Sequence, residues 1–157
     1  MTFFVLDVDS PIRRLRLRSD GHALIGVEML DDPKAPLAAD DRRETDDLLE
    51  QARAELDEYF AGARQAFDVP LAPTGTEFQQ RVWRALTAIP YGTTISYRAL
   101  AERIGQPTAT RAVGLANGRN PIAIVIPCHR VIGADGSLTG YGGGLERKRT
   151  LLDLEAR

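Results

Sequence analysis

Residues 96–121, SYRALAERIGQPTATRAVGLANGRNP, decide the fold of this chain. Ser96 is placed to cap a first helix that ends at Arg103, and Gly105 allows a tight break after it. A second helix is predicted over about residues 108–116. Two short helices joined by a glycine-containing turn form the helix-turn-helix pattern. The pattern also occurs in plain helical proteins, so the surrounding sequence must decide its meaning.

The second of these helices has an unusual composition. Its small residues are Ala109, Ala112, Gly114 and Ala116. Small side chains let a helix approach another surface closely. Packing inside the protein would explain them, but it would not explain Arg111, the one long basic residue in their midst.

Further along, residues 124–136 read IVIPCHRVIGADG and contain the chain's single cysteine, Cys128, followed by His129. The apolar run AIVIP at 123–127 predicts a short buried strand, so Cys128 is expected where that strand ends. A lone cysteine in such a place is more often inert core than nucleophile. The adjacent histidine changes this, because a thiol needs a nearby base to become the nucleophilic thiolate.

The predicted strand raises a geometric objection. Neighbouring side chains of an extended chain point to opposite faces, so His129 reaches Cys128 only through a sharp turn or a bridging water. The imidazole also needs a third group to orient it. The carboxylates downstream are Asp135, Glu146, Asp153 and Glu155. Residues 145–157 predict a helix that could turn Glu155 inward, but the residues alone do not choose among the four. The leucines expected on its core face are Leu151, Leu152 and Leu154.

The first half of the chain predicts a small sheet. Antiparallel strands are expected over residues 3–8, 15–19 and 23–30. A proline-punctuated loop (31–41) and a helix (45–60) follow. The segment VPLAPTG at 69–75 is a connector and marks the boundary between two lobes. Beyond it, Thr74 and Glu77 have the spacing of a capping box for another helix.

Composition and charge support two unlike lobes. The chain has 157 residues and a net charge of −2. Residues 1–75 hold 9 basic and 16 acidic residues (net −7), and residues 76–157 hold 11 and 6 (net +5). An acidic and a basic lobe indicate a division of labour.

The composition of the chain also excludes several classes of protein. No apolar run has the length of a membrane span, and the N-terminus MTFFVLDVDSP does not have the character of a signal peptide. One cysteine with two histidines makes a poor zinc site and no internal disulfide, so we expect no metal and a reducing, cytoplasmic setting. No glycine motif follows a strand, so no cofactor is expected.

Several sequence motifs together resemble those of one known family. PCHRV (127–131), the preceding RAVGLANGRNP and the following LTGYGGG resemble the O6-alkylguanine-DNA alkyltransferases, also called methylated-DNA–protein-cysteine methyltransferases. The match runs from about 76 to 155 and includes FQQRVWRAL and IPYGTTISYRALA. The resemblance implies an α/β (α+β) fold: a ribonuclease-H-like sheet domain over 1–72 and a winged helix-turn-helix domain over 73–157.

The resemblance also implies roles at the reacting centre. Cys128 would accept the alkyl group, and His129, oriented by Glu155, would act on it through a water. Tyr97 would hydrogen-bond N3 of the departing guanine. Val131 and the loop containing Tyr141 and Gly142 would line the base pocket. Some relatives carry serine where this chain has Gly142, so a backbone donor survives here but a hydroxyl does not.

Further roles implied by the resemblance concern DNA. Arg111 would enter the duplex and fill the space left by a flipped base. Thr110, Ala112 and Gly114 would contact the DNA beside it. Asn120 would hold the cysteine loop against the helix-turn-helix.

The function implied is direct-reversal DNA repair. The methyl group of O6-methylguanine, and of O4-methylthymine, would pass irreversibly to Cys128, so each molecule would act once. The partner is double-stranded DNA containing O6-alkylguanine, with no membrane involved. A monomer is expected, and cooperative binding along DNA is left open.

Three other hypotheses compete. A damage-sensing module that does not react would carry tryptophan where this chain has Cys128. A cysteine hydrolase would use the same side chains, but its cysteine and histidine are usually distant in sequence. An adaptive-response regulator with a zinc domain would need cysteines that this chain lacks.

Overall fold

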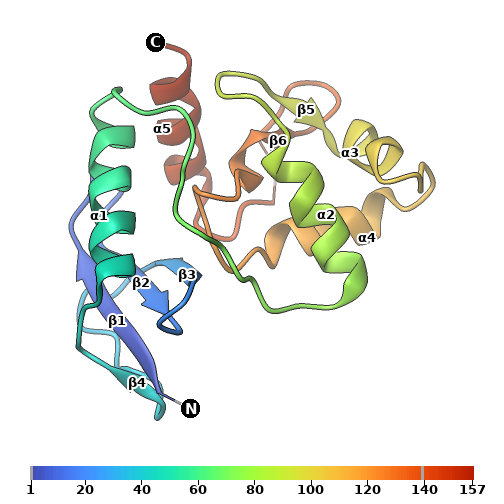
Figure 1. Cartoon of the computed structure of the whole chain (residues 1–157). Coiled ribbons are helices and arrows are strands. Elements are labelled where there is room, and N and C mark those ends of the chain that lie inside the picture. The colour runs from blue at the N-terminus through green and yellow to red at the C-terminus, as the bar shows by residue number, and fades with distance from the viewer. Residues whose placement is uncertain (1, 139) are drawn as a thin grey trace. The chain divides into compact units, whose positions relative to one another are not determined.

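The computed structural model describes residues 2–138 and 140–157, which divide into two compact units (Figure 1). The first unit runs to Pro73 and also includes Pro121–Ala123. The second comprises Thr74–Asn120 and Ile124–Arg157. Strands dominate the first unit and helices the second, so the predicted combination of a sheet domain and a helical domain is confirmed.

The first unit is built on a four-stranded sheet in the order β3-β2-β1-β4. Its strands are β1 (Phe3–Val8), β2 (Leu15–Ser19), β3 (Leu24–Met29) and β4 (Asp41–Arg42). The first three pair antiparallel, as predicted, and β4 pairs parallel with β1. β4 lies at the end of the segment that the sequence predicted as loop only.

Helix α1 (Asp47–Phe60) covers one face of this sheet (Figure 1). Asp46 caps it by accepting the backbone N–H of Leu49 at 2.7 Å. Leu15 and Leu17 of β2 are fully buried on the α1 side of the sheet. The alternation of leucine and arginine along β2 therefore sets which face of the strand packs against the helix.

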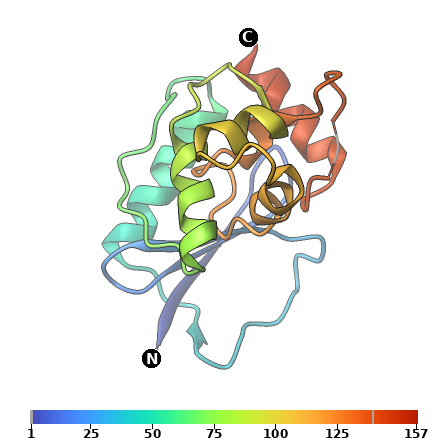
Figure 2. The same ribbon diagram turned by 90° about the vertical axis from the view of Figure 1, so that its right-hand side faces the viewer.

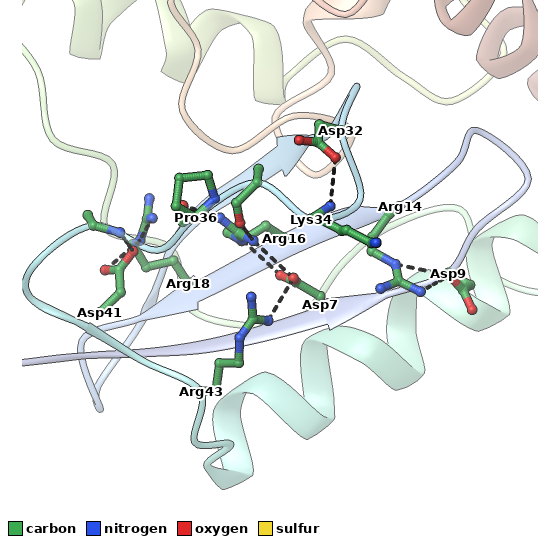
Figure 3. A network of polar contacts seen from close by, with 12 residues as sticks. Asp7, Asp9, Arg14, Arg16, Arg18, Asp32, Lys34, Pro36, Asp41 and Arg43 are labelled. Carbon is green, nitrogen blue, oxygen red and sulfur yellow. Dashed lines mark hydrogen bonds and ion pairs between the residues drawn. The ribbon is translucent and has the colours of Figure 1, made fainter.

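The other face of β2 carries an arginine that is only 2% exposed (Figure 3). The Arg16 guanidinium donates to both carboxylate oxygens of Asp7, at 2.9 and 3.0 Å. It also donates to the carbonyls of Ala35 and Pro36, at 2.7 and 3.0 Å. Arg43 donates to the same carboxylate at 3.0 Å. This network fastens the segment after β3 onto the sheet.

The second unit begins with α2 (Glu77–Thr87) and ends with α5 (Leu145–Glu155). Between them lie β5 (Ile95–Ser96), α3 (Tyr97–Arg103), α4 (Thr110–Gly118), the 3₁₀ helix η1 (Cys128–Arg130) and β6 (Val131–Ile132). Figure 2 shows α2, α3 and α4 gathered together, coloured green, yellow and orange. β5 and β6 form a two-stranded parallel sheet.

A capping box does start α2, but the residues predicted for it were wrong. Thr76 accepts the N–H of Gln79 at 3.1 Å, and the Gln79 side chain accepts the N–H of Thr76 at 2.9 Å. The predicted pair was Thr74 and Glu77. Glutamine serves in a capping box as glutamate does, so the box forms with Thr76, the residue directly before the helix, and Gln79.

The helix-turn-helix is present as α3 and α4. Ser96 caps α3 through the N–H of Ala99 at 3.0 Å, as predicted. Gly105 adopts a φ of 76° in the turn, a conformation that glycine takes without strain. α4 starts at Thr110, later than expected, and extends to Gly118. The indole N–H of Trp83 donates to the Ala116 carbonyl at 2.9 Å, which holds α4 against α2.

The strand predicted at 123–127 was wrong. These residues form turns, and Ile124 adopts a positive φ of 72°, which an extended strand excludes. The carbonyl of Ile126 accepts from the Asn120 side chain at 2.7 Å instead of from a neighbouring strand. The run is nevertheless mostly buried, and the Ile126 carbonyl also accepts the N–H of Cys128 at 2.8 Å, so local donors satisfy it.

α5 follows the prediction at its end. Leu151 and Leu154 are buried, whereas Leu152 is only partly so. Glu155, the last residue of the helix, is 4% exposed, which confirms that the helix turns it inward. No helix within the described ranges is both long and apolar enough to cross a bilayer.

The Asp7 network predicts acid-sensitive stability. Burial raises the pKa of Asp7, but hydrogen bonds from Arg16 and Arg43 outweigh it and hold the pKa below its ordinary value. A lowered native pKa contributes stability above the unfolded-state pKa that is lost as the pH falls. We expect Asp7→Asn to lower the free energy of unfolding by about 3 kcal/mol at neutral pH, because the buried arginine loses its counterion.

Urea unfolding between about pH 7 and pH 3 measures this effect. The difference between wild type and Asp7→Asn should shrink as the pH falls. Asp9→Asn is the matched control, because Asp9 pairs with Arg14 while its side chain is 86% exposed. A difference that stays constant with pH would contradict the assignment.

Candidate active site

The 3₁₀ helix Cys128–Arg130 presents three buried side chains in succession. Its turn is closed by the N–H of Arg130, which donates to the Pro127 carbonyl at 3.1 Å. A 3₁₀ helix has three residues per turn, so successive side chains point in three directions. The alternating geometry expected for an extended chain does not apply here. The sharp turn was one of the two arrangements that the sequence left open.

His129 is fully buried and joined to Glu155, with Nε2 2.7 Å from Oε2. The residues had left four carboxylates open, and this one lies beside the imidazole. The other ring nitrogen, Nδ1, is buried without a hydrogen-bond partner among the described residues. Such an atom is where a buried water is expected. Burial lowers the pKa of His129, while the hydrogen bond to Glu155 raises it.

Arg130 is a site residue that sequence reasoning missed. Its Nε donates to Glu155 Oε1 at 2.8 Å, and its Nη2 to Oε2 at 3.1 Å. Nη1 donates to the carbonyl of Ile89 at 2.6 Å. The only signal in the sequence is its place directly after His129, which does not reveal that it shares the same carboxylate.

Two asparagines hold the backbone around Cys128. The Asn117 side chain donates to the Cys128 carbonyl at 3.3 Å, and Asn120 donates to the Ile126 carbonyl. Asn120 was predicted to hold the cysteine loop, whereas Asn117 was missed. Both come from the end of α4 or just after it, so that helix and the cysteine turn are joined by hydrogen bonds.

Burial raises the pKa of the Cys128 thiol. Hydrogen bonds from the side chains of Asn120 and Tyr141 and the charge of Lys148 act in the opposite direction. On balance the pKa stays raised, so the thiol is protonated at rest, and these three side chains are the groups that stabilise the thiolate once a base takes the proton.

Lys148 is a third residue that the sequence did not reveal. It is fully buried, and its Nζ donates to the Val131 carbonyl at 2.6 Å. The ammonium lies 5.9 Å from the ring centre of Tyr97 and 5.8 Å from that of Tyr141. Burial lowers the pKa of Lys148, and the charge of the Cys128 thiolate raises it. Thiolate and ammonium therefore stabilise each other.

Helix α4 displays the residues predicted to contact DNA. Arg111 and Ala112 are exposed, and Thr110 and Gly114 are partly so. A Cβ added at Gly114 would lie 3.8 Å from the Tyr97 ring, so the small residue brings this face of α4 against Tyr97. Leu115, which sequence reasoning did not single out, is 62% exposed on the same helix.

The glycine-rich segment closes the site from another side. A Cβ added at Gly140 would lie 3.8 Å from the Tyr97 hydroxyl, and one at Gly142 would lie 3.6 Å from the Gly118 carbonyl. Gly142 is exposed and Tyr141 is partly buried. Within the described ranges, no cluster of three or more His, Cys, Asp or Glu side chains could hold a metal ion.

Models of two protein domains match the chain. Residues 77–157 match the model described as "6-O-methylguanine DNA methyltransferase, DNA binding domain". Residues 6–73 match the model described as "6-O-methylguanine DNA methyltransferase, ribonuclease-like domain". Together they account for most of the chain.

Individual proteins are similar over nearly their whole length. A methylated-DNA–protein-cysteine methyltransferase of Mycolicibacterium paratuberculosis is 55% identical over 150 residues, covering 96% of this chain and 90% of that protein. One from Methanosarcina acetivorans is 51% identical, covering 94% of each. The crystal structures of the Mycobacterium tuberculosis O6-methylguanine methyltransferase and of OGT from that organism in complex with DNA are both 50% identical, with TM-scores of 0.89 and 0.87. Both cover 99% of this chain and 93% of theirs.

The position of Lys148 leads to a prediction about the reactivity of the Cys128 thiol. Replacing Lys148 with Met removes a charge that lowers the pKa of Cys128, so that pKa should rise. We expect alkylation of Cys128 by iodoacetamide at neutral pH to slow by about threefold to tenfold, because less thiolate is present. Lys34→Met is the matched control, since Lys34 is the chain's other lysine and is exposed. Equal rates in Lys148→Met and wild type would show that the ammonium does not act on the sulfur.

Proposed function

The chain belongs to the 6-O-methylguanine DNA methyltransferase family, and from that premise we propose that Cys128 is the residue that accepts the methyl group. The protein is a methylated-DNA–protein-cysteine methyltransferase, which repairs DNA by moving an alkyl group from a base to its own cysteine. The observation that carries the proposal is the buried turn that holds Cys128 beside His129, with Glu155 bonded to the imidazole at 2.7 Å.

The transfer begins with the thiol proton. It passes through a bridging water to His129, whose Nδ1 is buried without a partner among the described residues. Glu155 holds the opposite nitrogen and stabilises the imidazolium that forms. The water relay also accommodates the sharp turn, since it requires no direct bond between the two neighbouring side chains.

The thiolate sulfur then attacks the methyl carbon. A carbon–sulfur bond forms, the bond from that carbon to O6 breaks, and its electron pair goes to the base. The base takes up one proton, so the products are unmodified guanine and S-methylcysteine. Tyr97 assists by hydrogen-bonding N3 of the departing guanine, and the nearby Lys148 offsets the negative charge of the thiolate before attack.

A buried cysteine cannot reach a methyl group inside a stacked duplex, so the base must be turned out of the DNA. We assign this step to α4, which presents Arg111 to replace the flipped base. Thr110, Ala112 and Gly114 lie around it and let the helix approach the groove. The net charge of +5 over residues 76–157 supplies attraction to phosphates, so binding should weaken as salt rises.

The remaining groups shape the surroundings of the flipped base. Tyr141 and Gly142 lie in the segment that closes the site, and Val131 lies against Lys148. Asn120 fixes the approach to Cys128 through the Ile126 carbonyl. We propose that this arrangement accepts O6-methylguanine and also O4-methylthymine.

The wider setting follows from the same parts. Residues 73–157 contain every residue assigned above, so this domain performs both DNA binding and transfer, and residues 1–72 form the accompanying sheet domain. A nucleophilic thiol needs a reducing compartment, so we propose a cytoplasmic setting. The monomer contains a whole set of assigned residues, so it needs no second copy to react.

Each molecule should act only once. The thioether has no leaving group that water can displace, and Cys128 is the chain's only cysteine. Repaired guanine should therefore appear up to one equivalent of protein and then stop, while the protein gains the mass of a methyl group. The measurement is intact-protein mass together with base analysis after mixing with duplex DNA that carries O6-methylguanine. Repeated rounds with purified protein would overturn the single-use mechanism.

Cys128→Ser is the matched variant for that experiment. A hydroxyl is far less acidic than a thiol, so we expect transfer below about a tenth of wild type with DNA binding nearly intact. Gel-shift binding on the same duplex separates the two effects. Substantial residual transfer would point to another acceptor.

Arg111 predicts a difference between substrates. If it replaces a stacked base, Arg111→Ala should slow transfer from a duplex several-fold more than from a single strand, which has less stacking to lose. Single-turnover rates on both substrates measure the ratio. Arg149→Ala, an exposed arginine on α5, should leave that ratio unchanged. Equal losses on both substrates in Arg111→Ala would make Arg111 an ordinary phosphate contact.

A further inference from the structure

Arg130 makes more ordered contacts than a residue that only fills the core would need. Its guanidinium bonds to both oxygens of Glu155, at 2.8 and 3.1 Å, and to the Ile89 carbonyl at 2.6 Å. Its carbon Cζ lies 5.7 Å from the centre of the Tyr91 ring. Three elements therefore meet at this side chain: the 3₁₀ turn, the chain just after α2 and the end of α5.

The carboxylate that Arg130 binds is in an unfavourable place. Glu155 is the last residue of α5, where the helix dipole is negative, and the last turn of α5 contains no basic residue. Its side chain is 1% exposed, so water cannot compensate the charge. The two side chains that follow Cys128 supply hydrogen-bond partners for the carboxylate, and the N–H of Gly92 also donates to Oε1 at 3.5 Å. The bidentate bond of an arginine fork to a carboxylate also sets its orientation.

His129 and Arg130 both bind the Glu155 carboxylate, so both interact with the same negative charge. The charged groups that act on His129 are Glu155 and Lys148 from α5 and Arg130 from its own turn. Burial lowers the pKa of His129 most, Glu155 raises it, and the charges of Arg130 and Lys148 lower it. Removing Arg130 would leave the full carboxylate charge to draw a proton onto the imidazole.

We propose that Arg130 is a positioning residue for methyl transfer: it orients the Glu155 carboxylate and offsets its charge, so that His129 rests as an uncharged base able to take the Cys128 proton. The inference rests on the proposed function, because it assumes the roles given to Cys128 and His129. A protonated His129 could not accept the thiol proton. Arg130 acts through the other two side chains and does not touch the base itself.

The test compares Arg130→Gln with Arg130→Lys. Glutamine removes the charge and the fork, whereas lysine keeps the charge without the bidentate geometry. Single-turnover transfer from duplex O6-methylguanine is followed between about pH 5 and pH 9, across the range where a histidine titrates. The final extent of methyl transfer gives the fraction of molecules that are folded, and the rate constant describes those molecules alone. Arg16→Gln is the matched control, because Arg16 also forms a buried bidentate pair of hydrogen bonds with a carboxylate, that of Asp7 in the other unit.

We expect Arg130→Gln to slow transfer by at least about tenfold at neutral pH and to move the acidic limb of its pH profile upward, with recovery at high pH. Arg130→Lys should lose rate while its limb stays near that of wild type. Arg16→Gln should lower the melting temperature without changing the profile.

A wild-type rate in Arg130→Gln, or a loss that is equal at every pH, would overturn the proposal and leave Arg130 a structural residue. If Arg130→Gln does not fold, Arg130→Lys decides: a reduced rate with an unmoved limb supports the proposal, and a wild-type rate sinks it. If the proposed function itself is wrong, the result differs: either wild type does not transfer the methyl group, or Cys128→Ser still transfers it.

Discussion

A carboxylate removed from water must be matched by nearby cations or donors, and Glu155 is the place where this constraint organises the second unit. It ends α5, where the helix dipole adds to its negative charge. His129 and Arg130 supply the compensation from a single 3₁₀ turn, and Arg130 continues to the Ile89 carbonyl beyond α2. The end of α5, the cysteine turn and the end of α2 are thereby held together, so the bonds that allow the charge to be buried also fix His129, the proposed base, next to Cys128.

The backbone around Cys128 obeys a second constraint, because it is buried without belonging to a sheet. Side chains donate to it: Asn117 to the Cys128 carbonyl and Asn120 to that of Ile126, while Lys148 donates to the carbonyl of Val131, where β6 begins. Each such bond has a second effect on function. The asparagines tie the cysteine turn to the end of α4, and the lysine brings a positive charge near the sulfur. The same set of contacts thus satisfies backbone carbonyls and acts on the Cys128 thiol.

The residues proposed for DNA contact and for methyl transfer lie in one unit. The exposed face of α4 and the buried turn are joined by the asparagines and by Tyr97, whose ring lies against Gly114 and below the Lys148 ammonium. A helix that moved on DNA would therefore act on the residues around Cys128 through short contacts. The first unit has its own buried network at Arg16, which secures its sheet independently of these residues.

The sequence by itself determined the features that depend on local contacts. Strand alternation, the Ser96 cap and the break at Gly105 are readable because their partners lie within a few residues. In the candidate site, the adjacency of Cys128 and His129 pointed to a nucleophile and a base, while the roles of Glu155, Tyr97 and Arg111 came from the family resemblance. Only the tertiary structure decided that Arg130 shares a carboxylate 25 residues away, and that AIVIP is a buried turn and not a strand. Hydrophobicity predicts that such a run is buried, but its conformation depends on which donors reach its backbone groups, such as Asn120 at the Ile126 carbonyl, and hydrophobicity does not specify these.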